Sequence, residues 1–141
     1  MTRIQYRPLP KYKYQLVVDH EQMIRIRPRN PIATPFIKLS ADGLLKIGKD
    51  YAWDGPSGPS FDTLNFMRGS LVHDALYQLM RMEHLDYQIH REAADDELRD
   101  ICIEDGMPKV RAWWVHKGVR LGGKSSAQPP EPPVPAAVWA P

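Results

Sequence analysis

The first fifty residues contain short segments in which apolar and polar residues alternate. In residues 23–27, for example, Met23, Arg25 and Arg27 alternate with Ile24 and Ile26. A period of two places successive side chains on opposite faces of a strand, so this segment predicts a half-buried β-strand. We predict four such strands, at residues 14–19, 23–27, 36–40 and 44–47. Ala-Asp-Gly at 41–43 predicts a hairpin turn between the last two, and we expect a small antiparallel sheet.

The pattern changes to a helical period from Asp62. Apolar residues then recur at steps of three or four, which predicts a first helix that ends near Met82. A second helix is predicted at about residues 86–104, where Gly106 suits the C-terminal end. A third is predicted from Pro108, a residue favoured in the first helical turn, to about Leu121.

These elements predict an α+β fold. A small N-terminal antiparallel sheet would pack against a three-helix C-terminal part that contains an antiparallel helical hairpin. The length of 141 residues allows one domain with a modest core. We expect that domain at 1–123, with a β-rich part at 1–50, a loop rich in glycine and proline at 51–60 and helices at 61–122. Residues 124–141, with six prolines in the last thirteen positions, predict an extended polyproline-like tail.

The net charge of +2 conceals a strong asymmetry along the chain. Residues 1–50 carry ten Lys/Arg against four Asp/Glu, whereas residues 51–106 carry four against twelve. A basic first third could meet nucleic acid or an anionic surface, but a solvated strand face is the simpler interpretation, and we predict no specific nucleic-acid partner. The single cysteine excludes an intramolecular disulfide framework. We expect no signal peptide and no transmembrane segment, because no apolar stretch is long enough.

The spacing of two residues in the helical hairpin indicates a candidate site. His73 lies eleven residues before His84, where the hairpin turns, and Asp95 lies eleven residues after it. Positions equidistant from the turn lie at the same height in an antiparallel hairpin, so the imidazole and the carboxylate can meet. Asp95 would accept the proton on Nδ1 of His73 and leave Nε2 as a general base that faces solvent.

Two neighbours of His73 extend this candidate site. Asp74 points about 100° further round the helix, where it can turn towards the loop at 51–60. One carboxylate with several backbone carbonyls and waters is a calcium-type site, and such a cation could polarise a carbonyl group. Tyr77, one turn after His73, could hydrogen-bond Asp95 and hold it.

The segments YAWDGPSGPS, RGSLVHDALYQLMR and REAADDEL resemble an uncharacterised family of bacteriophage and prophage proteins over roughly residues 36–122. The same stretch is similar to the catalytic core of phospholipases A2. In that core a glycine-containing calcium loop precedes a helix with His-Asp-x-x-Tyr, and an antiparallel helix supplies an aspartate 21–22 residues after the histidine.

This second resemblance implies a role for each matching residue. His73 would be the base that activates water, Asp95 its orienting partner, Asp74 the calcium ligand and Tyr77 the support of Asp95. The calcium loop would correspond to the segment that contains Asp54, Gly55 and Gly58, although this chain lacks the cysteine pairs that usually brace those enzymes. The resemblances imply a phage-encoded, calcium-assisted hydrolase that acts on an ester in or near a membrane lipid, located in the virion or the host cytoplasm.

Two functions of other classes stay open. One is a non-catalytic phage structural or assembly protein of the tail or virion, in which the His-Asp pair only staples two helices. Its proline-rich tail, with Trp139 near the end, would contact other phage structural proteins. The other is a metal-dependent phosphohydrolase, which normally needs further histidine ligands, and His20 in a strand-like region is a poor candidate for one.

Four further residues have simpler interpretations. Trp53 beside the loop is interpreted as a core anchor, and Cys102 continues the apolar stripe of the second helix and is interpreted as core. Trp113 and Trp114 cannot both face inward on one helix, so at least one is expected at a partner or lipid surface.

Overall fold

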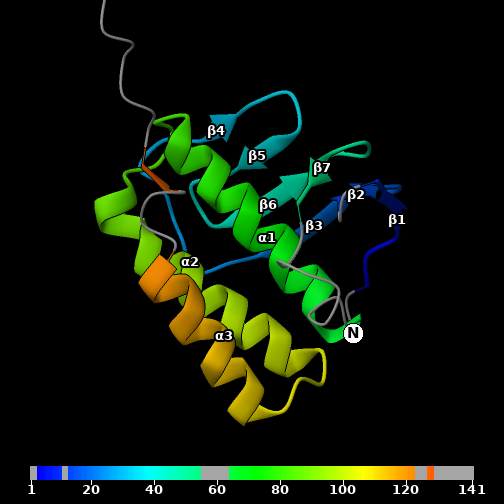
Figure 1. Ribbon diagram of the computed structural model, residues 1–141. Coiled ribbons are helices and arrows are strands. Elements are labelled where there is room, and N and C mark those ends of the chain that lie inside the picture. The colour runs from blue at the N-terminus through cyan, green and yellow to red at the C-terminus, as the bar shows by residue number, and fades with distance from the viewer. Residues whose placement is uncertain (1–2, 11–12, 55–63, 123–126, 129–141) are drawn as a thin grey trace, which may run out of the picture.

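The computed structural model describes residues 3–10, 13–54, 64–122 and 127–128. It has the α+β architecture that the pattern predicts, with short antiparallel strands followed by three helices (Figure 1). The strands are β1 (Tyr6–Leu9), β2 (Lys13–Leu16), β3 (His20–Met23), β4 (Ile32–Ala33), β5 (Ile37–Leu39), β6 (Leu44–Ile47) and β7 (Ala52–Trp53). The helices are α1 (Leu64–Arg81), α2 (Tyr87–Glu104) and α3 (Lys109–Gly122). None of the helices described is long and apolar enough to cross a membrane.

The strands form two sheets instead of the single sheet expected. One has the order β1-β2-β7 and the other the order β3-β6-β5-β4, and all their pairings are antiparallel. The predicted hairpin between β5 and β6 is confirmed, with Leu39 opposite Leu45 and Gly43 at a φ of 94° in the turn. The strand expected at 23–27 ends at Met23, yet Ile24 and Ile26 are buried while Arg25 is exposed. The alternation was therefore a correct guide to burial, although this segment is not paired as a strand.

The segment expected as a loop at 51–60 begins with a strand. β7 pairs with β2, which places Trp53 in the core at 3% exposure, as its interpretation as a core anchor required. The indole Nε1 of Trp53 donates to the hydroxyl of Ser70 at 3.0 Å, and the hydroxyl of Tyr51 donates to Gln78 at 3.0 Å. Both bonds end on α1, so the segment at 51–53 fixes the position of that helix against the three-stranded sheet.

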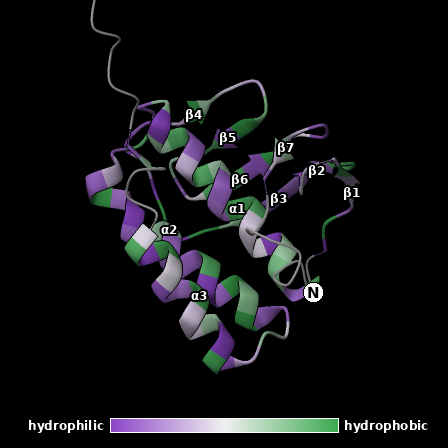
Figure 2. Cartoon of the chain, in the orientation of Figure 1, coloured by the Kyte–Doolittle hydropathy of each residue, from purple (hydrophilic) through white to green (hydrophobic). Residues whose placement is uncertain are grey.

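α1 is the central helix of the molecule. It packs against α2, and thirteen of its eighteen residues are buried, so its buried surface extends well beyond a single stripe. α3 packs on α2 and lies on the far side of α2 from the strands (Figure 1). Hydrophobic and hydrophilic residues alternate along α1 and α2 (Figure 2). Because α1 buries polar residues such as Arg68, Ser70 and His73, these side chains need hydrogen-bond partners on neighbouring elements.

α2 begins and ends where its sequence signals predict. Asp86 is the N-cap residue, and its carboxylate accepts a hydrogen bond from the backbone N–H of Gln88 at 2.8 Å. The helix ends before Gly106, which has a φ of 101°, and Pro108 follows. Cys102 is fully buried in a cluster between the three helices, which confirms its interpretation as a core residue.

Two arginines link the helices to distant parts of the chain. Arg25 forms ion pairs with Glu97, at 2.5 Å, and with Asp100, both on α2. Arg68, which is 4% exposed, donates to both oxygens of Asp105 at 2.8 and 3.0 Å. These contacts fix α2 relative to the segment after β3 and fix the end of α2 relative to α1.

Two residues near the start of the predicted tail, Ala127 and Gln128, pack on the domain. Ala127 is fully buried in the main core, and the side chain of Gln128 donates to the hydroxyl of Tyr87 at 3.2 Å. The packed part of the chain thus continues past the boundary expected at residue 123. The remainder of the predicted tail, 129–141, lies outside the described residues.

Candidate functional site

The hairpin of α1 and α2 brings His73 and Asp95 together, as their equal distances from the turn predict. Nε2 of His73 lies 2.8 Å from Oδ1 of Asp95, and the hydroxyl of Tyr77 donates to the same oxygen at 2.6 Å. The rings of His73 and Tyr77 are stacked at a tilt, with centroids 4.1 Å apart. Asp95 is fully buried and His73 is 7% exposed. The predicted contacts of Asp95 with His73 and with Tyr77 are therefore confirmed.

The predicted roles of the two imidazole nitrogens were wrong. Nε2 is bound to Asp95, and Nδ1 lies on the side of Asp74, 4.0 Å from its carboxylate oxygen. The reason is geometric, because Nε2 lies farther from the backbone than Nδ1 and is the atom that can reach across to α2. With Asp95 accepting from Nε2–H, the neutral ring carries its free electron pair on Nδ1, beside Asp74.

Burial and charge act on the pKa values of this cluster in opposite directions. Burial alone lowers the pKa of His73, but the carboxylates of Asp74 and Asp95 outweigh it and raise that pKa above its ordinary value. Burial likewise raises the pKa of Asp95, while the hydrogen bonds from His73 and Tyr77 bring it below its ordinary value. Burial and the adjacent Asp95 raise the pKa of Tyr77, so Tyr77 remains a hydrogen-bond donor. The cluster therefore holds Asp95 ionised and favours a proton on His73.

α3 contributes a cation that the sequence did not reveal. Nε of Arg120 lies 3.3 Å from Oδ2 of Asp95, the oxygen that His73 and Tyr77 do not use. Within the described part of the chain neither of these two atoms has a hydrogen-bond partner, so their interaction is a buried charge contact. The backbone carbonyl of Arg120 accepts a hydrogen bond from Arg91 at 2.6 Å, which holds this end of α3 against α2.

Asp96, the next residue of α2, is directed at α3 instead of α1. Its carboxylate lies 2.7 Å from Nε2 of His116 and 3.1 Å from Nη2 of Arg120. His116 thus has a partner that its sequence position did not suggest. His116 and Arg120 are four residues apart and share one face of α3, which is the signal that could have identified them.

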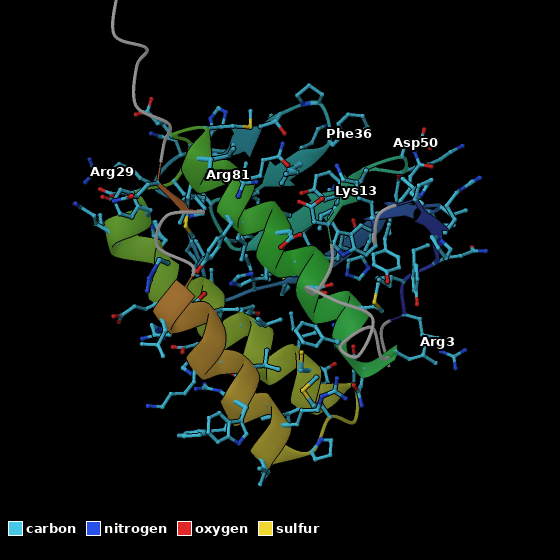
Figure 3. The ribbon with its side chains drawn as sticks, viewed as in Figure 1. Arg3, Lys13, Arg29, Phe36, Asp50 and Arg81 are labelled. Carbon is cyan, nitrogen blue, oxygen red and sulfur yellow. The ribbon has the colours of Figure 1, made fainter. Side chains whose placement is uncertain are left out.

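Two of the four residues predicted to hold calcium, Asp74 and Asp54, lie in the described part of the chain. The carboxylate of Asp74 is 32% exposed and lies 4.0 Å from Nδ1 of His73. Asp54 is 81% exposed and lies 3.7 Å from the ammonium group of Lys13. Lys13 is labelled in Figure 3. Gly55 and Gly58 lie outside the described residues.

The charges of Asp74 and Asp54 both act on the phenol of Tyr51. Burial raises the pKa of Tyr51, and the negative charges of Asp74 and Asp54 raise it further. Within the ranges that the structure describes, no group of three or more His, Cys, Asp or Glu side chains could hold a metal ion. Of the two predicted ligands in the described part of the chain, Asp74 and Asp54, the carboxylate of Asp74 lies beside His73.

A separate cavity of about 390 Å³ lies over the four-stranded sheet. Its lining includes Phe36 and Lys38 at β5, and His20 at the start of β3. Burial lowers the pKa of His20, whose Nε2 lies 2.7 Å from the amide oxygen of Gln22. None of the residues predicted for the His73 site lines this cavity.

The arrangement around His73 has the parts that base catalysis requires. An imidazole is oriented by a buried carboxylate, that carboxylate is fixed by a phenol and a guanidinium, and the second nitrogen of the ring lies beside a partly exposed acid. Comparisons of this chain with models of protein families, with curated proteins and with solved structures find no match.

Proposed function

We propose that this protein is a hydrolase in which His73 is the general base. The observation that carries the proposal is the geometry of His73, whose Nε2 is held by the buried Asp95 while Nδ1 lies 4.0 Å from the carboxylate of Asp74. An imidazole held in this way can accept a proton at Nδ1 without turning, which lowers the cost of reaching the transition state.

The reaction proposed is ester hydrolysis. At a pH above the raised pKa of His73 the ring is neutral, and its Nδ1 takes a proton from a water molecule while the water oxygen attacks the ester carbonyl. The tetrahedral intermediate then collapses, the alkoxide leaves, and the proton on Nδ1 passes to that alkoxide. The products are a carboxylic acid and an alcohol, and His73 returns to its neutral form.

Calcium is part of this proposal, with Asp74 as its carboxylate ligand. Asp74 suits this role because its carboxylate is partly exposed and lies beside His73. When bound, a calcium ion would supply positive charge for the oxygen of the ester carbonyl.

The substrate class proposed is an ester of a membrane phospholipid, in the setting of a bacteriophage. This part comes from the His-Asp-x-x-Tyr pattern of His73, Asp74 and Tyr77 and from the spacing to Asp95. The same geometry is compatible with esters of other kinds, so the choice of substrate must be tested separately from the choice of base.

The experiment compares the wild type with His73→Gln in hydrolysis of phospholipid vesicles, with added calcium or with a chelator. We expect hydrolysis in calcium only, and a loss of at least about a hundredfold in His73→Gln, the low end of what a positioned base contributes. His84→Gln changes an exposed histidine at the hairpin turn and is the matched control that keeps its activity. Asp74→Asn should lose calcium binding in calorimetry as well as hydrolysis.

One observation favours a second function, that of a phage structural or assembly protein. Asp95 contacts His73 and Tyr77 on α1 and Arg120 on α3, so the same cluster fastens three helices. If the folded wild type neither binds calcium nor hydrolyses any ester while His73→Gln is less stable, this staple is the better account. No observation in the described residues favours the phosphohydrolase.

A further inference from the structure

One face of α3 is apolar and exposed. It consists of Val110, Trp113, Trp114, Lys117 and Leu121, which we call the Trp face. Each of them lies three or four residues from at least one other member, which places them on the same side of the helix. The four apolar members are 72%, 48%, 65% and 83% exposed, respectively. Exposed apolar groups scattered singly are ordinary, but a continuous row of large ones indicates a surface that binds something.

The rest of α3 shows which side is already used. Ala112 is fully buried, and Val115 and Val119 pack with it in the cluster between the helices. These residues lie opposite the Trp face, so the inner side of α3 meets α2 and its outer side has no covering element among the described residues. Both hydrophobic and hydrophilic residues appear along the visible side of this helix (Figure 2).

The charge of α3 restricts what can bind there. The helix carries four basic residues and no acidic one: Lys109, Arg111, Lys117 and Arg120. Arg120 is engaged with the aspartates of α2, whereas the ammonium group of Lys117 lies over the ring of Trp113, 5.2 Å from its centroid. A second copy of the chain docked through the same face would oppose like charges, so the complementary partner is anionic.

The two tryptophans favour a lipid surface over a protein as the anionic partner. Their rings meet edge to face at 4.9 Å, and in the described part of the structure neither indole N–H donates to the protein. Indoles with free N–H groups, beside lysines that can extend their ammonium groups to phosphates, suit the headgroup layer of a bilayer. A single helix also presents a convex surface, which a fluid bilayer can accommodate without a shaped groove.

We propose that the Trp face binds the surface of an anionic lipid bilayer, with α3 lying parallel to it. The apolar residues enter the boundary between headgroups and acyl chains, and the basic residues pair with lipid phosphates. The proposal rests on the proposed function only in taking the bilayer as the source of the ester. Binding itself requires no hydrolysis.

The test measures binding of the full chain to vesicles of phosphatidylcholine and phosphatidylglycerol in equal parts, and to vesicles of phosphatidylcholine alone. We expect binding to the anionic vesicles that weakens with salt, and quenching of tryptophan fluorescence by brominated lipids. Each lysine removed should lower the affinity roughly fivefold. Lys109→Glu/Lys117→Glu should therefore bind more than about 25-fold more weakly, because two charges are reversed.

The apolar contribution has its own variant and a matched control. Trp113→Ala/Trp114→Ala should lose at least about tenfold in affinity, since two interfacial side chains are removed. Ile89→Ala removes another exposed apolar side chain, 69% exposed on α2, and should bind as the wild type does. All three variants change exposed side chains, so circular dichroism spectra like that of the wild type are expected.

Several outcomes would overturn the proposal. One is that the wild-type chain does not bind anionic vesicles. Another is that Trp113→Ala/Trp114→Ala binds them with the affinity of the wild type. A dimer in sedimentation that this double variant abolishes would assign the face to a second copy. Binding to polyglutamate as tight as to the vesicles, with both tryptophans dispensable, would assign it to an acidic protein.

The result is separable from that of the proposed function. His73→Gln should bind vesicles as the wild type does, and Trp113→Ala/Trp114→Ala should still hydrolyse a soluble short-chain ester. Vesicle binding without any hydrolysis would support the membrane-binding role of the Trp face and contradict the proposed hydrolase activity. Hydrolysis of the soluble ester without vesicle binding would support the hydrolase activity and contradict membrane binding by the Trp face.

Discussion

Replacing Asp95 with asparagine removes a buried charge and almost no volume. In the wild type this carboxylate receives hydrogen bonds from His73 and Tyr77 at 2.8 and 2.6 Å, and Arg120 lies 3.3 Å from its other oxygen. A hydrogen bond to a charged group contributes about 1.5–3 kcal/mol. The asparagine oxygen retains part of both bonds, but its NH2 group would face the guanidinium of Arg120. We expect Asp95→Asn to lower the free energy of unfolding by about 3 kcal/mol.

Asp96→Asn provides the matched control in the adjacent position. Its carboxylate is 32% exposed and pairs with His116 and Arg120 near solvent, so its loss should cost at most about 1 kcal/mol. Urea denaturation at pH 7, followed by circular dichroism, gives both values if the m-value is unchanged. In thermal unfolding, Asp95→Asn should melt roughly 6–12 °C below the wild type.

The pH dependence makes this prediction sharper. The pKa of Asp95 is lowered in the folded chain, so its contribution is complete above the ordinary value of 3.8 and is lost as the pH falls through the folded value. The deficit of Asp95→Asn should therefore shrink in acid. Equal effects of Asp95→Asn and Asp96→Asn at pH 7, or a loss under 1 kcal/mol for the former, would refute the reasoning that a buried charge centres this cluster.

Three further predictions follow from groups near the site. Because the pKa of His73 is raised on folding, its contribution to stability is complete below pH 6.5 and is lost as the pH rises through the folded value. His73→Gln should abolish that decline in unfolding experiments from pH 6 to 9, and an unchanged decline would contradict the assignment. A Cβ on Gly69 would lie 2.8 Å from Sγ of Cys102 and 3.0 Å from a methyl of Leu98, whereas one on Gly118 meets nothing within 4 Å. Gly69→Ala should therefore destabilise the chain by about 1 kcal/mol and Gly118→Ala stabilise it by about 0.5–1 kcal/mol, and the same sign for both in urea denaturation would be the wrong outcome. Burial raises the pKa of the Cys102 thiol to about 12, so iodoacetamide at pH 8 should label the chain only in urea, and labelling of the folded chain would contradict its burial.

The helices could be predicted from the sequence more accurately than the strands. The signals that bound α2 and start α3 are local: the cap at Asp86 starts α2, and the Gly106–Pro108 segment ends it and starts α3. The strands β1, β4 and β7 were missed, and β3 overlaps a predicted strand only at Met23, because these strands are two to four residues long and depend on partners elsewhere in the chain. β7 pairs with β2 across nearly forty residues, and no local pattern specifies such a pairing.

In the candidate site, too, the contacts set by local spacing could be predicted, and those set by packing between distant elements could not. The contact of His73 with Asp95 could be predicted because a tight hairpin fixes both by counting from the turn. The choice of Nε2 depends on how the ring points across the gap, which spacing does not determine. Arg120 and His116 were missed because the packing of α3 on α2 follows from side chains that bury between them. The predicted cation ligand Asp54 pairs with Lys13 instead, a contact made through β2 and the end of β7.

Asp95 and Asp96 are consecutive residues, of which Asp95 contacts α1 and α3 and Asp96 contacts α3, and this has a consequence for how the chain can vary in length. One residue inserted or deleted between Tyr87 and Ala94 would rotate the rest of α2 by about 100°. Asp96 or Ala94 would then occupy the place of Asp95 opposite His73, and the partner of His116 would be lost at the same time. Changes of length should therefore be tolerated better in the turn between α1 and α2 than within the first two turns of α2. A library of single-residue insertions and deletions, sorted for folded protein, would map that boundary directly.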